Sequence, residues 1–120
     1  MSDASYILVV DDDPDLRQNM ADVLEDEGYA TRVAGSGREA LALMKKTPEV
    51  PRLILLDLLM PDMNGWQFCH AQRADHRLVD VPVLVVTANR NLGPDPPGND
   101  VLLKPFRLEE ILQKEKRLAG

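Results

Sequence analysis

Five side chains that can bind a metal ion or a phosphate group follow short apolar runs in this sequence. They are Asp11, Asp12, Asp57, Thr87 and Lys104. Apolar runs of this kind are typical of strands buried on both faces of a parallel sheet. Ligands bind beyond the carboxyl ends of the strands in open α/β sheets. We therefore expect the five side chains to meet at one edge of a sheet, although they are far apart in the sequence.

The three carboxylates of this set predict a metal site beside a nucleophile. Asp11 and Asp12 are adjacent and repel each other, and a bound cation would offset that repulsion. A hard divalent cation such as Mg²⁺, or Mn²⁺ in its place, takes oxygen ligands, often carboxylates together with phosphate and water. Asp12 and Asp57 would be ligands, and Asp11 would hold a coordinated water. Asp57 would then act as a nucleophile and become an aspartyl phosphate.

The other two members of the set suit the phosphoryl group itself. Lys104 would pair with one phosphoryl oxygen, and the Thr87 hydroxyl would contact another. Taken singly, each residue also has a structural explanation, because Asp57 can begin a loop, Thr87 can belong to a turn and Lys104 can be a solvated residue at a strand end. The combination favours phosphoryl chemistry, because these residue types arrive in order at the ends of four expected strands.

Strands and helices are expected to alternate along the chain, which predicts an α/β fold with a parallel sheet and right-handed crossovers. The expected strands cover residues 6–10, 29–33, 53–57, 80–86 and 101–103. The expected helices cover about 14–27, 36–46, 65–73 and 106–118. The interval 89–99 contains three prolines and two glycines, which exclude a normal helix there.

Local signals predict how the first two helices begin and end. Asp13 is the expected N-cap of the first helix, Pro14 takes its first position, and Gly28 ends it. Ser36 and Glu39 form an expected capping box for the second helix. The buried face of the first helix is expected to carry Leu16, Met20, Val23 and Leu24.

Composition limits the class of protein. A chain of 120 residues has room for one domain, which we place at residues 1–120. The formal net charge of −6 argues against direct binding to nucleic acid phosphates. The single cysteine, Cys69, cannot form an internal disulfide or a zinc cage, and we expect it to pack as a small apolar residue. Neither a signal peptide nor a stretch long enough for membrane insertion is visible, so a cytoplasmic location is expected.

Four motifs together carry a family resemblance that covers nearly the whole chain. The motifs are Val9–Pro14, Leu55–Pro61 with Asn64–Gly65, Val86–Ala88 and Leu103–Phe106. In this combination they resemble the CheY-like receiver domain of bacterial two-component response regulators. The resemblance implies a flavodoxin-like five-stranded parallel sheet of order 2-1-3-4-5 with helices on both faces.

The resemblance also assigns roles to individual residues. It implies that Asp57 accepts a phosphoryl group from a histidine kinase or a histidine phosphotransfer protein. It implies that the backbone carbonyl of Leu59 joins Asp11, Asp12 and Asp57 in holding Mg²⁺. Thr87, Ala88 and Lys104 would contact the phosphoryl group, and the Lys104–Pro105 peptide bond is expected to be cis.

Two departures from the family pattern affect the expected output. A loop rich in proline and glycine stands where the family has its fourth helix, so that helix is expected to be missing or replaced. Val101 stands where the family has an aromatic switch residue, three places before Lys104. The downstream protein target is therefore unknown. No effector domain follows Gly120 in this sequence, so the chain is either a stand-alone receiver or a piece of a larger protein.

Two other interpretations remain open. The first is a binding module of receiver fold that signals without phosphorylation, which the lost helix and the lost aromatic residue favour. The second is a small phosphatase of the haloacid dehalogenase type, with Asp11 as the nucleophile and Asp13 as the acid. Pro14 argues against the second, because that family favours Thr or Val there. In the leading interpretation the chain is no enzyme, and its only chemistry is the gain and loss of its own phosphoryl group.

Overall fold

The chain folds around one parallel sheet, as the sequence predicts. The computed structural model describes residues 5–58, 60 and 62–119. The sheet has five strands in the order β2-β1-β3-β4-β5, and all four neighbouring pairs are parallel. The strands are β1 (Ile7–Val10), β2 (Thr31–Ala34), β3 (Leu53–Asp57), β4 (Val83–Thr87) and β5 (Asp100–Leu103). This order confirms the predicted flavodoxin-like topology.

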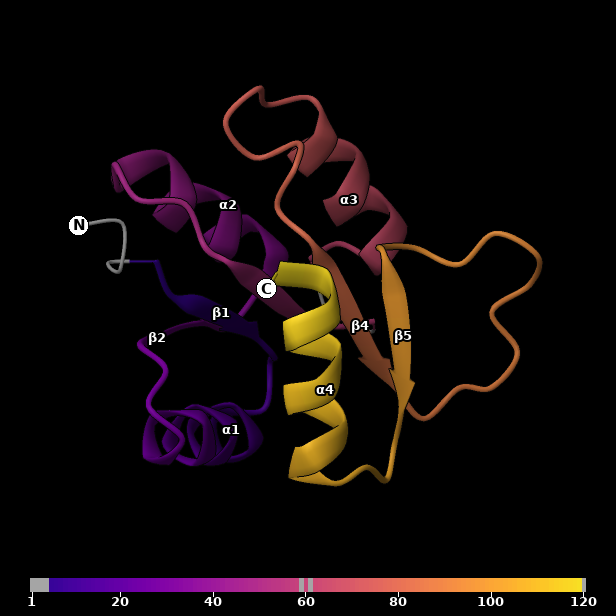
Figure 1. Ribbon diagram of the computed structural model, residues 1–120. Coiled ribbons are helices and arrows are strands. Elements are labelled where there is room, and N and C mark those ends of the chain that lie inside the picture. Colours follow the sequence, from indigo (N-terminus) through magenta and orange to yellow (C-terminus); the bar gives the residue numbers. More distant parts are fainter. Residues whose placement is uncertain (1–4, 59, 61, 120) are drawn as a thin grey trace.

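Four helices of the described chain cover both faces of the sheet (Figure 1). They are α1 (Pro14–Asp26), α2 (Gly37–Lys46), α3 (Gly65–Arg73) and α4 (Leu108–Ala119). Leu24 of α1 and Ile111 of α4 pack with Leu55 of β3 on one face. Met44 of α2 and Phe68 of α3 belong to the core on the other face. Because successive side chains of a strand point to opposite faces, the apolar strands supply both cores.

The predicted helix starts are mostly confirmed. The Asp13 side chain caps α1 by accepting hydrogen bonds from the backbone N–H groups of Asp15 and Leu16, at 3.0 and 3.3 Å. Gly28 follows the end of α1 with a φ of 96°, which an L side chain rarely adopts. Ser36 caps α2 as predicted, but the Glu39 carboxylate accepts from Gly35 N–H and not from the cap residue itself. The expected capping box is therefore only half formed.

The predicted buried face of α1 is wrong at two positions. Leu24 is fully buried, and Ala21 is buried beside it, but Leu16 and Val23 are 49% and 38% exposed. Leu16 and Val23 are seven residues apart, so they lie on one stripe of the helix, and that stripe faces a cavity and not the sheet. An apolar periodicity in the sequence does not say whether a stripe meets the sheet or an open groove beside it.

The connection between β4 and β5 is a loop, as the prolines and glycines predict. In the described chain no helix lies between Thr87 and Asp100 (Figure 1). The loop is held near its end by Asn99, whose backbone N–H donates to Val83 O and whose side chain accepts from Val83 N–H, both at 2.8 Å. The indole N–H of Trp66 donates to the carbonyl oxygen of Asp95 at 3.0 Å. These contacts pin the loop to β4 and α3.

A buried acid ties α4 to the amino ends of the strands. Glu115 is 1% exposed and accepts hydrogen bonds from Arg52, 2.6 Å away, and from the Tyr29 hydroxyl, 2.9 Å away. Burial and the neighbouring Glu115 raise the pKa of Tyr29, because both disfavour the phenolate. Asp100, at the start of β5, pairs with Lys114 and Arg117 of the same helix.

Two smaller expectations concern Cys69 and membrane insertion. Cys69 is buried on α3, as expected of a small apolar residue, and burial raises the pKa of its thiol. Over the residues that the structure describes, no helix has both the length and the apolar character needed to cross a bilayer.

Candidate functional site

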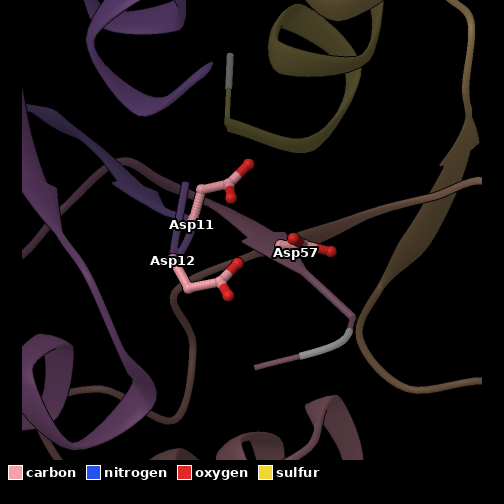
Figure 2. Close-up of side chains that lie close together, drawn as sticks. All are labelled: Asp11, Asp12 and Asp57. Atoms are coloured by element: carbon pink, nitrogen blue, oxygen red, sulfur yellow. The ribbon is translucent and has the colours of Figure 1, made fainter. Parts of the chain in front are cut away.

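The structure brings the three predicted acids together at the carboxyl edge of the sheet. Asp11 and Asp12 follow β1, and Asp57 is the last residue of β3. These strands are neighbours, with Val10 paired to Leu56, so their ends lie side by side. Carboxylate oxygens of the three residues all lie within 4.8 Å of one another (Figure 2). Residues more than 40 positions apart thus form one cluster, as the sequence predicts.

Strand pairing and backbone hydrogen bonds set the positions of these acids. Asp57 is held in register with Val86 of β4 and is half-buried. The backbone N–H of Asp11 donates to Ala34 O at 3.1 Å, which extends the pairing of β1 with β2 by one residue. One carboxylate oxygen of Asp11 accepts from the N–H of Asp13 at 2.9 Å. Asp12 lies between these two anchored residues and is exposed.

A cavity of about 630 Å³ opens beside the acid cluster and contains further predicted site residues. Asp11, Asp57, Ala88 and Lys104 line it together. The remaining lining is mostly apolar and comes from the sheet, from α1, from the segment that leads into α4, and from α4 itself. The residues of that lining are Val9, Val10, Leu16, Asn19, Met20, Val23, Leu55, Val86, Pro105, Phe106, Leu108 and Ile111. The predicted lysine and the predicted nucleophile therefore share one pocket.

Thr87 lies at the end of β4, as predicted, and its hydroxyl contacts the loop that follows the strand. Its side chain is 3% exposed, and its hydroxyl oxygen accepts a hydrogen bond from the backbone N–H of Asn89 at 3.0 Å. The hydroxyl proton is not used by that bond and remains available for donation. The carbonyl oxygen of Thr87 accepts from Lys104 N–H at 2.8 Å, so Thr87 and Lys104 lie at adjacent strand ends.

Two further expectations concern Pro105 and Leu59. The Lys104–Pro105 peptide bond is cis, which confirms the expectation. The expected metal contact through the backbone carbonyl of Leu59 falls outside the described residues.

Asp13, the acid of the phosphatase interpretation, uses its carboxylate to cap α1. Its position gives that interpretation no support.

Sequence reasoning missed two residues that position this edge of the sheet. Asp62 accepts hydrogen bonds from the backbone N–H groups of Gly37 and Arg38 at 3.3 and 2.9 Å, which ties the segment after β3 to the start of α2. Burial raises the pKa of Asp62, but these N–H donors outweigh it and hold the pKa below its usual value. Arg17 donates to the carbonyl oxygen of Asp11 at 2.9 Å. Neither contact has a periodic or motif signal in the sequence.

The donor set fits a hard divalent cation. Three carboxylates from two strand ends offer only oxygen atoms, which Mg²⁺ and Mn²⁺ prefer over nitrogen or sulfur. Asp12 is exposed, while Asp11 and Asp57 are half-buried, so an ion can enter and keep part of its water shell. Like charges this close repel one another, and a cation between them removes that cost.

Comparison with known proteins agrees with this geometry. Residues 7–116 match the family model of the response regulator receiver domain. The chain is 39% identical over 113 residues to the DNA-binding response regulator MtrA of Mycolicibacterium smegmatis, covering 90% of this chain and 47% of that protein. It is 37% identical over 117 residues to the DNA-binding dual master transcriptional regulator RpaA of Synechocystis, covering 93% and 48%. The chain thus spans about half the length of the curated relatives it matches.

Solved structures show the same fold. The chemotaxis response regulator CheY4 of Vibrio cholerae superposes with a TM-score of 0.83 at 32% identity, over 95% of this chain and 98% of that one. The response regulator TrrA of Thermotoga maritima, solved in complex with Mg²⁺ and BeF, superposes with a TM-score of 0.81 at 28% identity, over 95% and 98%. With the family model matched over nearly the whole chain, this protein belongs to the response regulator receiver domain family.

Proposed function

We propose that this receiver domain accepts a phosphoryl group on Asp57 from a histidine kinase or a histidine phosphotransfer protein, as a step of two-component phosphorelay signalling. One observation carries the proposal: carboxylate oxygens of Asp11, Asp12 and Asp57 lie within 4.8 Å of one another at the carboxyl edge of the sheet. That TrrA was solved with Mg²⁺ and BeF supports a site for a metal and a phosphoryl-like group in this fold.

Asp11, Asp12 and Asp57 would hold Mg²⁺ or Mn²⁺, together with the backbone carbonyl of Leu59. When bound, the ion offsets the negative charge that the cluster shares with an incoming phosphoryl group. Three carboxylates this close together concentrate negative charge at this edge of the sheet, which favours a divalent ion over a monovalent one.

The chain's own residues perform the transfer. A carboxylate oxygen of Asp57 attacks the phosphorus atom, an O–P bond forms, and the N–P bond to the donor histidine breaks, with its electron pair returning to the imidazole. Lys104 lines the same cavity as Asp57, and its ammonium group would pair with a phosphoryl oxygen there. The Thr87 hydroxyl and the Ala88 N–H donate hydrogen bonds to the remaining oxygens.

The output of this event is a change in protein–protein contacts. Phosphorylation of Asp57 biases an equilibrium between two conformations, and movement of the Thr87 hydroxyl toward the phosphoryl group draws along Asn89, whose backbone N–H is bonded to the hydroxyl oxygen. The loop of residues 89–99, which begins at this bond, is the segment that responds. The target is a downstream protein in the cytoplasm. The words "DNA-binding" in the names of MtrA and RpaA describe those longer proteins. The present chain has a formal net charge of −6, and it binds no nucleic acid directly.

The proposal is tested by incubation with acetyl phosphate and Mg²⁺, followed by intact-mass analysis. The wild type should gain the mass of one phosphoryl group, and Asp57→Asn should gain none. Chelation of the metal should abolish the gain. Lys104→Ala should still label in part but respond less in conformation. No gain by the wild type would favour the phosphorylation-independent binding module. Peptide mapping that places the group on Asp11 would favour the phosphatase interpretation and remove Asp57 from its role.

A further inference from the structure

The backbone of Asp11 is held from two directions, and one of the two contacts comes from a charged side chain. Its N–H donates to Ala34 O at 3.1 Å, and its carbonyl oxygen accepts from a terminal guanidinium nitrogen of Arg17 at 2.9 Å. Arg17 is half-buried on the first turns of α1. The first contact continues the sheet. The second joins the loop after β1 to the helix that follows it.

The peptide group that Arg17 holds is the one between Asp11 and Asp12. Fixing its carbonyl oxygen fixes the plane of that peptide, and with it the direction in which the chain leaves Asp11. Both carboxylates of the acid pair depend on this plane, because one precedes it and the other follows it. Asp57, in contrast, is already fixed by its place in β3 opposite Val86. The position of Asp57 is therefore set by the sheet, whereas the direction of the acid pair also depends on the contact with Arg17.

Gly35 supplies the space in which Arg17 makes this contact. A Cβ atom at position 35 would lie 2.8 Å from a terminal nitrogen of Arg17. The backbone of Gly35 does not have the positive φ found at Gly28, Gly93 and Gly98, so its conformation does not require glycine. Glycine is needed there because a side chain would occupy the space of the Arg17 guanidinium. The nearest obstacle to a larger residue is the far end of a flexible side chain, so an alanine there would displace Arg17 at little cost to the fold.

We propose that Arg17 is a positioning residue for the metal-binding acid pair: through the Asp11 carbonyl it aligns Asp11 and Asp12 with Asp57, in the space that Gly35 leaves open. This inference rests on the proposed function of the acid cluster. It predicts the direction in which Mg²⁺ affinity changes when Arg17 is replaced. A positive charge near a cation site opposes cation binding, so loss of charge alone would tighten Mg²⁺ binding. Loss of alignment weakens it.

Isothermal titration with MgCl₂ on the whole chain tests the proposal. Arg17→Met removes the charge and the donor but keeps the length of the side chain. We expect it to weaken Mg²⁺ binding about tenfold, the lower end of what the loss of a supporting contact causes at metal sites. Gly35→Ala keeps the charge and displaces the guanidinium, and it should weaken binding in the same direction. Arg17→Lys should recover part of the affinity, because an ammonium group can still donate to the carbonyl.

The control is Arg73→Met, which removes an exposed charge in the last turn of α3, at the opposite edge of the sheet. It should leave Mg²⁺ affinity unchanged. Thermal unfolding in EDTA provides the second readout, and the unfolding midpoint of Gly35→Ala should stay near that of the wild type. If the wild type binds Mg²⁺ and Arg17→Met binds it as tightly or more tightly, this inference is overturned and the proposed function is not. A wild type that binds no Mg²⁺ would overturn both the inference and the proposed function.

Discussion

Acidic side chains at the two edges of the sheet have opposite surroundings. At the amino edge, the buried carboxylate of Glu115 meets Arg52 at 2.6 Å and the Tyr29 hydroxyl at 2.9 Å. At the carboxyl edge, Asp11, Asp12 and Asp57 approach one another within 4.8 Å beside a cavity. The first arrangement is closed by the protein's own donors and holds α4 in place. The second gathers negative charge beside a cavity, where a cation can enter. The first arrangement supports the fold, and the second has the form expected of a binding site.

The largest expected effect is on the rate of phosphorylation, which should depend on the acids at the carboxyl edge and not on Glu115 at the amino edge. Asp12→Asn should lower the rate of labelling by acetyl phosphate at least about 100-fold, the upper end for residues that only support a metal ligand. Glu115→Gln should label at the wild-type rate at temperatures where it stays folded. Both rates follow from intact-mass time courses. A comparable loss of labelling in Glu115→Gln would mean that the two edges are not functionally distinct.

The next effect separates the edges by stability. Arg52→Met leaves the carboxylate of Glu115 buried without its counter-charge, and we expect it to lower the free energy of unfolding by about 3 kcal/mol. Urea denaturation followed by the fluorescence of the single tryptophan measures this loss. Glu109→Ala, at an exposed acid on the first turn of α4, is the matched control and should change stability little. A small loss in Arg52→Met would show that Tyr29 alone satisfies Glu115.

A third prediction concerns the metal. Free Mg²⁺ at about ten times its Kd should stabilise the wild type by about 1.4 kcal/mol, since it binds only the folded chain. Asp12→Asn should lose most of this increment. In EDTA the same variant should unfold at a slightly higher temperature than the wild type, because one repelling charge is gone. Thermal melts with and without Mg²⁺ give both numbers, and a lower melting temperature in EDTA would show that Asp12 supports the fold.

The smallest effect is a dependence on pH at the amino edge. Burial raises the pKa of Asp100, but Lys114, the Val101 N–H and Arg117 outweigh burial and leave the pKa below its usual value. A lowered pKa in the folded state gives stability that is present above the ordinary pKa of aspartate and lost as the pH falls through the lowered value. Asp100→Asn should therefore cost about 1 kcal/mol near neutral pH and converge with the wild type in acid. Urea denaturation across this pH range checks the convergence, and a constant gap would contradict it.

The cavity beside the acid cluster explains why the predicted buried face of α1 was wrong at two positions. Leu16 and Val23 have the spacing of core residues, and the sequence predicts them to be buried. They instead line the cavity that contains Asp57 and Lys104. The same apolar periodicity serves a packed face and a groove, and only the placement of α1 relative to α4 distinguishes them.

The sequence by itself determined the parts of this protein that depend on neighbouring residues. Apolar runs that end in Asp11 and Asp57 predict buried strands, Asp13 with Pro14 predicts the start of α1, and the prolines after Ala88 predict the missing helix. Each of these follows from local preferences of the backbone, which a short stretch of chain expresses without help.

Only the tertiary structure decided which polar side chains reach one another. Arg17 at the carbonyl of Asp11 and Glu115 beside Arg52 are contacts whose partners lack a shared motif. The second joins residues 63 positions apart. Such contacts depend on the rotation and height at which each helix settles on the sheet. Those two quantities come from packing the whole core at once, and so no single stretch of sequence contains them.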